Sequence, residues 1–220
     1  MEKNEILTSY LKQTQELFGD ELYLNKTKNP IEKNKNAKSD LDIFCTEISN
    51  CQKCVLGTSR NKFVFGVGDP QANLMLVGEA PGAEEDRLGE PFVGRAGKLL
   101  DKILTAINRS RIKDVYICNV LKCRPPNNRD PLASEVEQCE PYLLKQIEIM
   151  RPKLIVALGR VAGSTLLKVE QPLKGMRGIL HDYFGTPLIV TYHPAALLRN
   201  SNFKAATWED FKWIRSILDS

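Results

Sequence analysis

The sequence of 220 residues lacks long apolar runs: none approaches the ~20 residues that a helix needs to cross a bilayer. Its first residues, MEKNEILTSYLKQ, also lack the apolar core of a signal peptide. We therefore expect a cytoplasmic protein without a membrane partner, in a compartment where disulfides are uncommon. The six cysteines are then better candidates for free thiols or metal ligands than for bridges.

The charge is mild in total and uneven along the chain. Lys and Arg number 31 against 27 Asp and Glu, which gives a net charge of +4 with neutral histidine. Residues 1–43 hold seven of the basic and eight of the acidic residues, so 24 basic and 19 acidic residues follow position 43. The larger, C-terminal part is therefore the candidate for binding a polyanion such as DNA.

The first 43 residues have a different texture from the rest. Apolar residues at helical spacing predict a short amphipathic helix within 4–24 that ends near Gly19. Residues 25–42 contain five Lys and four Asn and are typical of a polar linker. We interpret 1–43 as a solvated appendage, whose helix could contact another protein, and 44–220 as the functional domain.

Strand-like and helical patterns alternate after position 43. Apolar runs of strand length lie at 63–65, 74–77, 115–121, 154–158 and 188–192. Helical patterns cover 97–107, 134–150 with Ser134 and Glu137 as a capping box, 160–167, and the chain after a cap at Ser201 or Asn202. The alternation predicts an α/β fold with a largely parallel sheet, whose near-continuous apolar strands indicate helices on both faces.

Unusual residues follow three of the predicted strands. They fill positions 78–82, 118–126 and 193–199. Because ligands of open α/β sheets bind at the carboxyl ends of parallel strands, we expect these three segments to converge on one edge and form the site.

The cysteines suggest a metal or cluster site. Four of them form two pairs that could share one centre: Cys51 with Cys54, and Cys123 with Cys139. Four thiolates from two segments fit a structural zinc or an iron–sulfur cluster, although the second spacing is wrong for a compact zinc ribbon. Ordinary buried thiols remain the alternative. Cys118 lies in a strand pattern, and Cys45 has no evident role.

Four motifs, taken together, carry a resemblance to a known family. They are GEAPG at 78–82, GEPFVGRAG at 89–97, NVLKCRPP at 119–126 and HPAALLR at 193–199. Over about 44–200 the sequence resembles the family 4 uracil-DNA glycosylases, the iron–sulfur branch of that superfamily. The resemblance implies a three-layer α/β/α fold with a central, mostly parallel four-stranded sheet, and removal of uracil from DNA to start base excision repair. It also implies a [4Fe-4S] cluster on Cys51, Cys54, Cys123 and Cys139.

Three residues match the positions that handle uracil in that family. Phe92 would stack under the base, which must first leave the DNA helix. The Asn119 amide would donate to O4 and accept from N3–H, a pattern that cytosine reverses. His193, rather than His181, would stabilise the departing uracil anion at O2, as a neutral imidazole or an imidazolium.

The segment after the first buried strand departs from the better-known family 1 enzymes. Gly78 allows close approach of the substrate, and Ala80 stands where family 1 has the Asp that orients water. Gly82 replaces the Tyr that excludes thymine, a role that the resemblance assigns to Glu85. We expect backbone near Ala80 to position the water, and Glu79 to assist electrostatically or to contact the base and its ribose.

The remaining candidates concern the DNA strand. Leu197 lies four positions after His193, where the superfamily places an apolar wedge, and Leu198 is the alternative. The basic residues expected to contact phosphates are Lys122, Arg124, Arg129 and Arg199. We expect a monomer that acts on single- and double-stranded DNA.

Other functions fit parts of this pattern. A glycosylase with altered base preference, for example for deaminated purines, is the main alternative. A non-catalytic iron–sulfur DNA-binding module would keep the fold but has no need of Phe92, Asn119 and His193. An electron carrier has no need of a His-Pro strand end. The related branch that cross-links abasic DNA carries an inserted loop ending in His, which is missing after Asn119.

Overall fold

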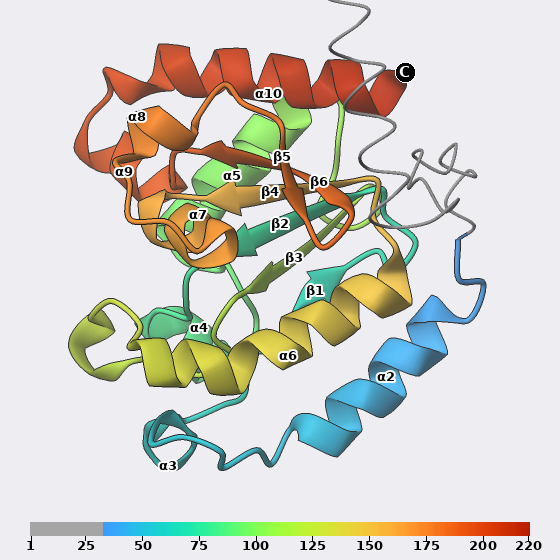
Figure 1. Ribbon diagram of the computed structural model, residues 1–220, viewed down its shortest axis with the longest axis vertical. Coiled ribbons are helices and arrows are strands. Elements are labelled where there is room, and N and C mark those ends of the chain that lie inside the picture. The colour runs from blue at the N-terminus through green and yellow to red at the C-terminus, as the bar shows by residue number, and fades with distance from the viewer. Residues whose placement is uncertain (1–32) are drawn as a thin grey trace, which may run out of the picture. The chain divides into compact units, whose positions relative to one another are not determined.

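The structure is a computed structural model that describes residues 33–220 (Figure 1). The helix predicted within 4–24 lies outside the described residues. The strands are β1 (Val67–Gly68), β2 (Leu74–Gly78), β3 (Val115–Asn119), β4 (Leu154–Leu158), β5 (His181–Tyr183) and β6 (Thr186–Thr191). The helices are α2 (Ala37–Ile48), α3 (Leu56–Ser59), α4 (Ala83–Leu88), α5 (Arg95–Ala106), α6 (Ala133–Met150), α7 (Arg160–Leu167), α8 (Leu173–Met176), α9 (Pro194–Arg199) and α10 (Phe203–Asp219), with a 3-10 turn at Pro126–Asn128. No described helix has the length and apolar character of a membrane span.

The strands form one mixed sheet in the order β1-β3-β2-β4-β6-β5. The four central strands are parallel, and β1 and β5 pair antiparallel at the two edges. The predicted fold class is therefore confirmed, but the count of four strands is wrong for the described residues, which contain six. Edge strands of two and three residues are too short to give a sequence pattern. The strand predicted at 63–65 is also wrong, since pairing begins only at Val67.

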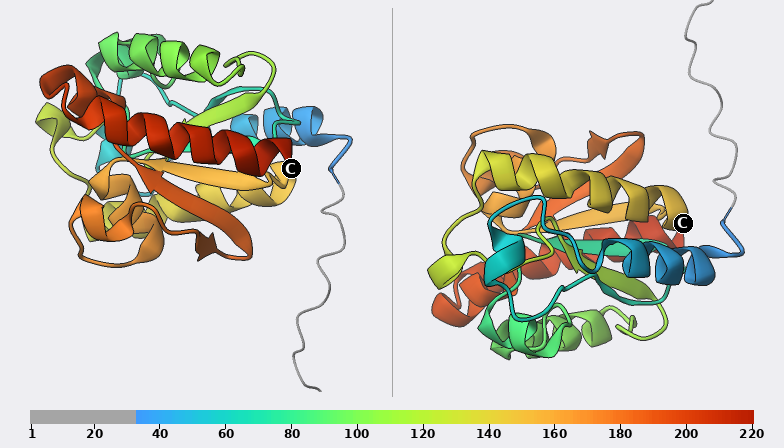
Figure 2. Two further views of the ribbon diagram at one scale, coloured as in Figure 1. Left: turned by 90° about the horizontal axis from the view of Figure 1, so that it is seen from above. Right: turned by 90° about the horizontal axis from the view of Figure 1, so that it is seen from below.

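Helices cover both faces of the sheet, as the near-continuous apolar strands predicted. Within β2, Leu74 and Leu76 pack with α5 and α10, whereas Met75 and Val77 pack with α2, α6 and α7. In the left view of Figure 2, α5 lies at the top, α10 crosses in front of the strands, and α7 lies toward the bottom. The result is a three-layer α/β/α arrangement in which the carboxyl ends of the central strands stay uncovered.

Two predicted boundaries are wrong. The linker predicted over 25–42 is helical from Ala37, and α2 buries Ala37 and Leu41 completely or nearly so. Two apolar residues four positions apart define that buried face, and the Lys and Asn residues around them concealed it. At the start of α6, the carboxylate of Glu135 accepts the backbone N–H of Leu132, so Ser134 and Glu137 form no capping box.

Candidate active site at the strand ends

A cavity of about 660 Å³ opens where the four central strands end. Glu79 follows β2, Asn119 ends β3, and His193 follows β6, and all three line this cavity. The predicted convergence of three strand ends is confirmed. The fourth end, Gly159 after β4, was not predicted, although a glycine between an apolar strand and a helical pattern was a usable signal. A side chain at Gly159 would crowd His193, because a Cβ added there would lie 3.0 Å from the His193 Cβ.

Phe92 lines the cavity from the loop between α4 and α5 and is 6% exposed. Its ring centroid lies 5.4 Å from that of His193, with the two planes tilted by 31°. Gly78 leaves room for this ring: a Cβ there would lie 2.8 Å from the Phe92 ring and 2.3 Å from Asn119 Oδ1. The glycine therefore lets the ring and the amide lie next to each other.

Asn119 is the last residue of β3 and pairs in register with Gly78 of β2. Its side chain is nearly buried, with the residue 2% exposed, yet it lines the cavity. Its backbone oxygen accepts a hydrogen bond from Lys122 Nζ. The side-chain amide makes no hydrogen bond to another described residue, so both its donor and its acceptor are available to a ligand.

His193 caps α9 with its ring. Nδ1 accepts the backbone N–H of Ala195 at 3.1 Å, so a neutral ring carries its proton on Nε2. Burial, and next the charge of Arg199, lower the pKa of His193 to about 4, and the more weakly acting Glu85 opposes this shift. The imidazole is therefore neutral near pH 7. His181 lies elsewhere, with Nε2 2.8 Å from the Met176 oxygen, and does not line the cavity.

Glu79 has an unusual acidity for a carboxyl group. Burial, and next the negative charge of Asp130, raise the pKa of Glu79 to about 7, and Arg160 opposes the shift. Asp130 and Arg160 form an exposed ion pair of 3.2 Å, and both line the cavity. Glu79 can therefore gain or lose a proton near neutral pH. Ala80 lines the cavity next to it and supplies no ionisable group.

Glu85 lies beside the position that Gly82 leaves empty. A Cβ on Gly82 would be 2.7 Å from Glu85 Oε2. The other carboxylate oxygen, Oε1, accepts the backbone N–H groups of Val93 and Gly94 at 3.0 and 3.1 Å. Glu85 is therefore fixed at the cavity wall, in the space that a side chain at 82 would fill.

The structure contradicts one predicted phosphate contact. Lys122 is 0% exposed, and its Nζ donates to Asn119 O at 2.8 Å and Gln146 Oε1 at 2.7 Å. Its place in a run of basic residues suggested a surface side chain, but the turn after β3 directs it inward. Arg129 and Arg199 do line the cavity, together with Arg160, which was not predicted. Arg124 lies outside the cavity lining and donates to Asn128 Oδ1.

The predicted wedge is also wrong in its first choice. Leu197 is 4% exposed, whereas Leu198, the alternative, is 44% exposed. Helix α9 explains the difference, because successive residues of a helix point about 100° apart. Leu197 faces the protein interior, and Leu198 faces solvent.

Four cysteines line a second, small cavity: Cys51, Cys54, Cys123 and Cys139. Three of the sulfurs already receive hydrogen bonds, from Tyr142 OH to Cys51, from Arg60 to Cys123 and from the Lys122 N–H to Cys139, at 3.1 to 3.3 Å. Donors of this kind typically surround thiolate-bound iron–sulfur clusters. Cys45 and Cys118 do not line this cavity.

The four thiols are not gathered tightly enough for a single ion. Within residues 33–220, no three His, Cys, Asp or Glu side chains form a group that could hold one metal ion. Four thiolates bound to one zinc at ~2.3 Å would lie about 4 Å apart.

Comparisons with known proteins agree with this geometry. The family model "Uracil DNA glycosylase superfamily" matches residues 65–212. A type-4 uracil-DNA glycosylase of Archaeoglobus fulgidus is 44% identical over 79% of this chain and 91% of the relative. One of Thermotoga maritima is 41% identical over 81% and 94%. A type-5 uracil-DNA glycosylase of Pyrobaculum aerophilum is 33% identical over 73% and 84%.

These matches cover the sheet, its strand ends and the Phe92 loop. The matched span also contains every residue placed at the cavity above, from Glu79 to Arg199. The chain belongs to the uracil DNA glycosylase superfamily.

Proposed function

We propose that this protein is a uracil-DNA glycosylase that hydrolyses the N-glycosidic bond of a flipped-out deoxyuridine and leaves an abasic site. It thereby starts base excision repair. The observation that carries the proposal is the neutral His193, whose free Nε2–H lies in the same cavity as Phe92 and Asn119. A stacking ring, an unpaired amide and an uncharged donor are what excision of uracil requires.

Recognition of the base rests on three side chains. Uracil enters over the Phe92 ring, and the Asn119 amide donates to O4 and accepts from N3–H. Cytosine presents the reverse pattern, which would leave a buried donor and acceptor unpaired. Glu85, held by two backbone N–H groups, stands in the place that a thymine 5-methyl group would need.

Bond breakage transfers the electron pair of the C1′–N1 bond to uracil. The negative charge accumulates on O2, where the His193 Nε2–H donates a hydrogen bond. Because its pKa lies near 4, the ring stays neutral and acts as a fixed donor without transferring its proton. A single donor of this kind contributes about 100- to 1000-fold to the rate.

The sugar becomes cationic as uracil leaves, and water then adds to C1′. Glu79 in its ionised form stabilises that cation, since its pKa of about 7 leaves a carboxylate available at neutral pH. Backbone near Ala80 positions the water, which needs no strong base because the cation is reactive. No lysine lines the cavity among the described residues, which supports a monofunctional enzyme that does not cut the strand.

DNA binding uses the rim and the exposed leucine. Arg129 and Arg199 at the cavity contact phosphates, with Arg124 nearby on the same basic segment. Leu198 enters the stack and holds the space that the flipped nucleotide leaves. We propose that a monomer acts on single- and double-stranded DNA.

A [4Fe-4S] cluster on Cys51, Cys54, Cys123 and Cys139 completes the proposal. The placement of all four cysteines around one small cavity and the donors to three of their sulfurs support it. The cluster would tie the segment before β1, which carries Cys51 and Cys54, to Cys123 in the turn after β3 and to Cys139 in α6. Its contribution is to hold these segments together, and no step of the hydrolysis passes through it.

The test uses an end-labelled oligonucleotide with one uracil, treated with alkali after incubation to cut abasic sites. Wild-type protein and His181→Ala should both produce the cut, whereas His193→Ala should be slower by about 100-fold or more while still binding DNA. His181→Ala is thus the matched control for His193→Ala. Oligonucleotides with hypoxanthine or xanthine test the altered base preference. A folded wild-type protein that leaves the uracil substrate uncut would refute the proposal.

A further inference from the structure

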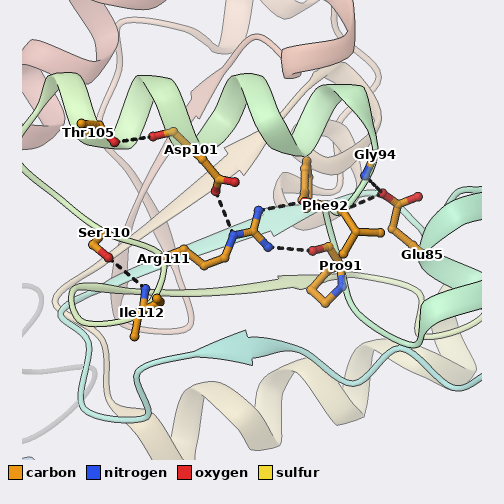
Figure 3. A network of polar contacts seen from close by, with 10 residues as sticks. Glu85, Pro91, Phe92, Gly94, Asp101, Thr105, Ser110, Arg111 and Ile112 are labelled. Carbon is orange, nitrogen blue, oxygen red and sulfur yellow. Dashed lines mark hydrogen bonds and ion pairs between the residues drawn. The ribbon is translucent and has the colours of Figure 1, made fainter.

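Arg111 lies outside the active-site cavity but holds the loop that carries Phe92 (Figure 3). It belongs to the connection between α5 and β3. Its guanidinium donates to the backbone oxygens of Pro91 at 3.0 Å and Phe92 at 2.8 Å. Its Nε donates to Asp101 of α5 at 2.8 Å, so the planar fork is fixed on a helix and directed at the loop.

The backbone of Phe92 needs such support. Its φ angle is +54°, in the left-handed region that bulky residues rarely adopt. Conformations of this kind persist only where several surrounding contacts require them. The loop is also packed closely on α5, since a Cβ on Gly97 would lie 1.7 Å from the Phe92 oxygen.

Opposite charges hold the two ends of the loop. Arg111 binds the carbonyl groups of Pro91 and Phe92, and the Glu85 carboxylate accepts the N–H groups of Val93 and Gly94. Figure 3 shows the two side chains approaching the loop from different sides. Four consecutive residues, 91–94, therefore have a backbone group bound by a charged side chain.

We propose that Arg111 is a positioning residue for excision: by holding the Pro91 and Phe92 carbonyls, it fixes the Phe92 ring as the floor on which uracil stacks. The expected effect of Arg111 on uracil release rests on the proposed function. The contacts between Arg111 and the Phe92 loop do not depend on that function. Charge-assisted hydrogen bonds to two successive carbonyls define the loop conformation, and the loop conformation defines where the ring lies.

The test compares Arg111→Met with Arg109→Met. Arg109 lies two positions away and pairs with Asp219, so it is a matched control without contact to the Phe92 loop. We expect Arg111→Met to slow uracil release in single turnover by roughly tenfold to 100-fold, as misplacement of a contact group does. Affinity for DNA that already carries an abasic site should stay unchanged, because that product does not use the ring.

Chemical rescue of Arg111→Met by added guanidinium ion distinguishes a positioning role of Arg111 from a general loss of structure. Arg111 is partly accessible, with 19% of its side chain exposed, so added guanidinium ion can enter the space left by Arg111→Met. We expect guanidinium to restore much of the lost rate in a saturable manner, and Arg111→Lys to retain an intermediate rate. Unchanged uracil release in Arg111→Met would overturn the inference, and so would an equal loss in Arg109→Met.

A measurement without substrate keeps the inference separate from the proposed function. Amide hydrogen exchange of the peptide covering 91–97 should accelerate in Arg111→Met and remain normal in Arg109→Met. If wild type releases no uracil but this difference appears, the function is wrong and the positioning role stands. If exchange does not change in Arg111→Met, the positioning role is wrong whatever the activity. Should Arg111→Met fail to fold, Asp101→Asn loosens the same guanidinium and provides the same comparison.

Discussion

The ionisation of Glu79 predicts how uracil release depends on pH. Burial raises the pKa of this carboxyl group to about 7, and the proposed role requires its charged form. With a pKa of 7, about 9% of the group is ionised at pH 6 and about 91% at pH 8. The single-turnover rate should therefore rise about tenfold between these values. His193 does not contribute to this rise, because its pKa of about 4 lies below the window.

Removing either of two charges near Glu79 should shift the pH at which the rate of uracil release rises. Asp130→Asn removes a negative charge that raises the pKa of Glu79, so the rise should move to lower pH. Arg160→Met removes an opposing positive charge, so the rise should move to higher pH. Glu79→Gln should give a slow rate without a rise. A tenfold rise that survives in Glu79→Gln would refute the assignment, because another group would then control the reaction.

Three further predictions concern other parts of the molecule. Asn119→Asp should lower the ratio of uracil to cytosine release at least tenfold, and an unchanged ratio of single-turnover rates would contradict edge reading. Cys123→Ser should yield protein without the brown absorption of an iron–sulfur cluster, whereas Cys45→Ser, outside the cysteine cavity, should stay brown. Lys122→Met should lower the free energy of unfolding in urea by about 2 kcal/mol, because two buried oxygens lose their donor. The exposed Lys145→Met should change it by less than about 0.5 kcal/mol, and equal effects would contradict this account.

The fold class and the place of the site could be predicted because each depends on a local pattern. Apolar runs with helices between them determine a parallel sheet, and parallel strands place their carboxyl ends at one edge. Asn119 and His193 could be found in this way, since each lies at or just beyond the carboxyl end of a recognisable strand. The edge strands β1 and β5 could not, because two or three residues have no period.

Side-chain direction was the part that sequence did not predict. Lys122 and Leu197 occupy segments that follow β3 and β6 at the predicted edge of the sheet, yet both point inward. A turn and a short helix determine these directions, and one residue of offset exchanges an exposed side chain for a buried one. Arg111 was missed for a related reason. Its partners are backbone carbonyls about 20 positions away, and such partners leave no trace in residue type.

The electrostatics of the cavity explain how one environment serves two opposite charges. The same burial lowers the pKa of His193 and raises that of Glu79, so the unbound site holds little net charge on these two groups at mildly acidic pH. Uracil is also neutral when it enters. In the proposed reaction, charge separation develops only as the C1′–N1 bond breaks, with the anion at the His193 donor and the cation toward Glu79. Both groups are already fixed in place, so the site need not reorganise at that moment, and its stabilising effect falls on the transition state rather than on the bound substrate.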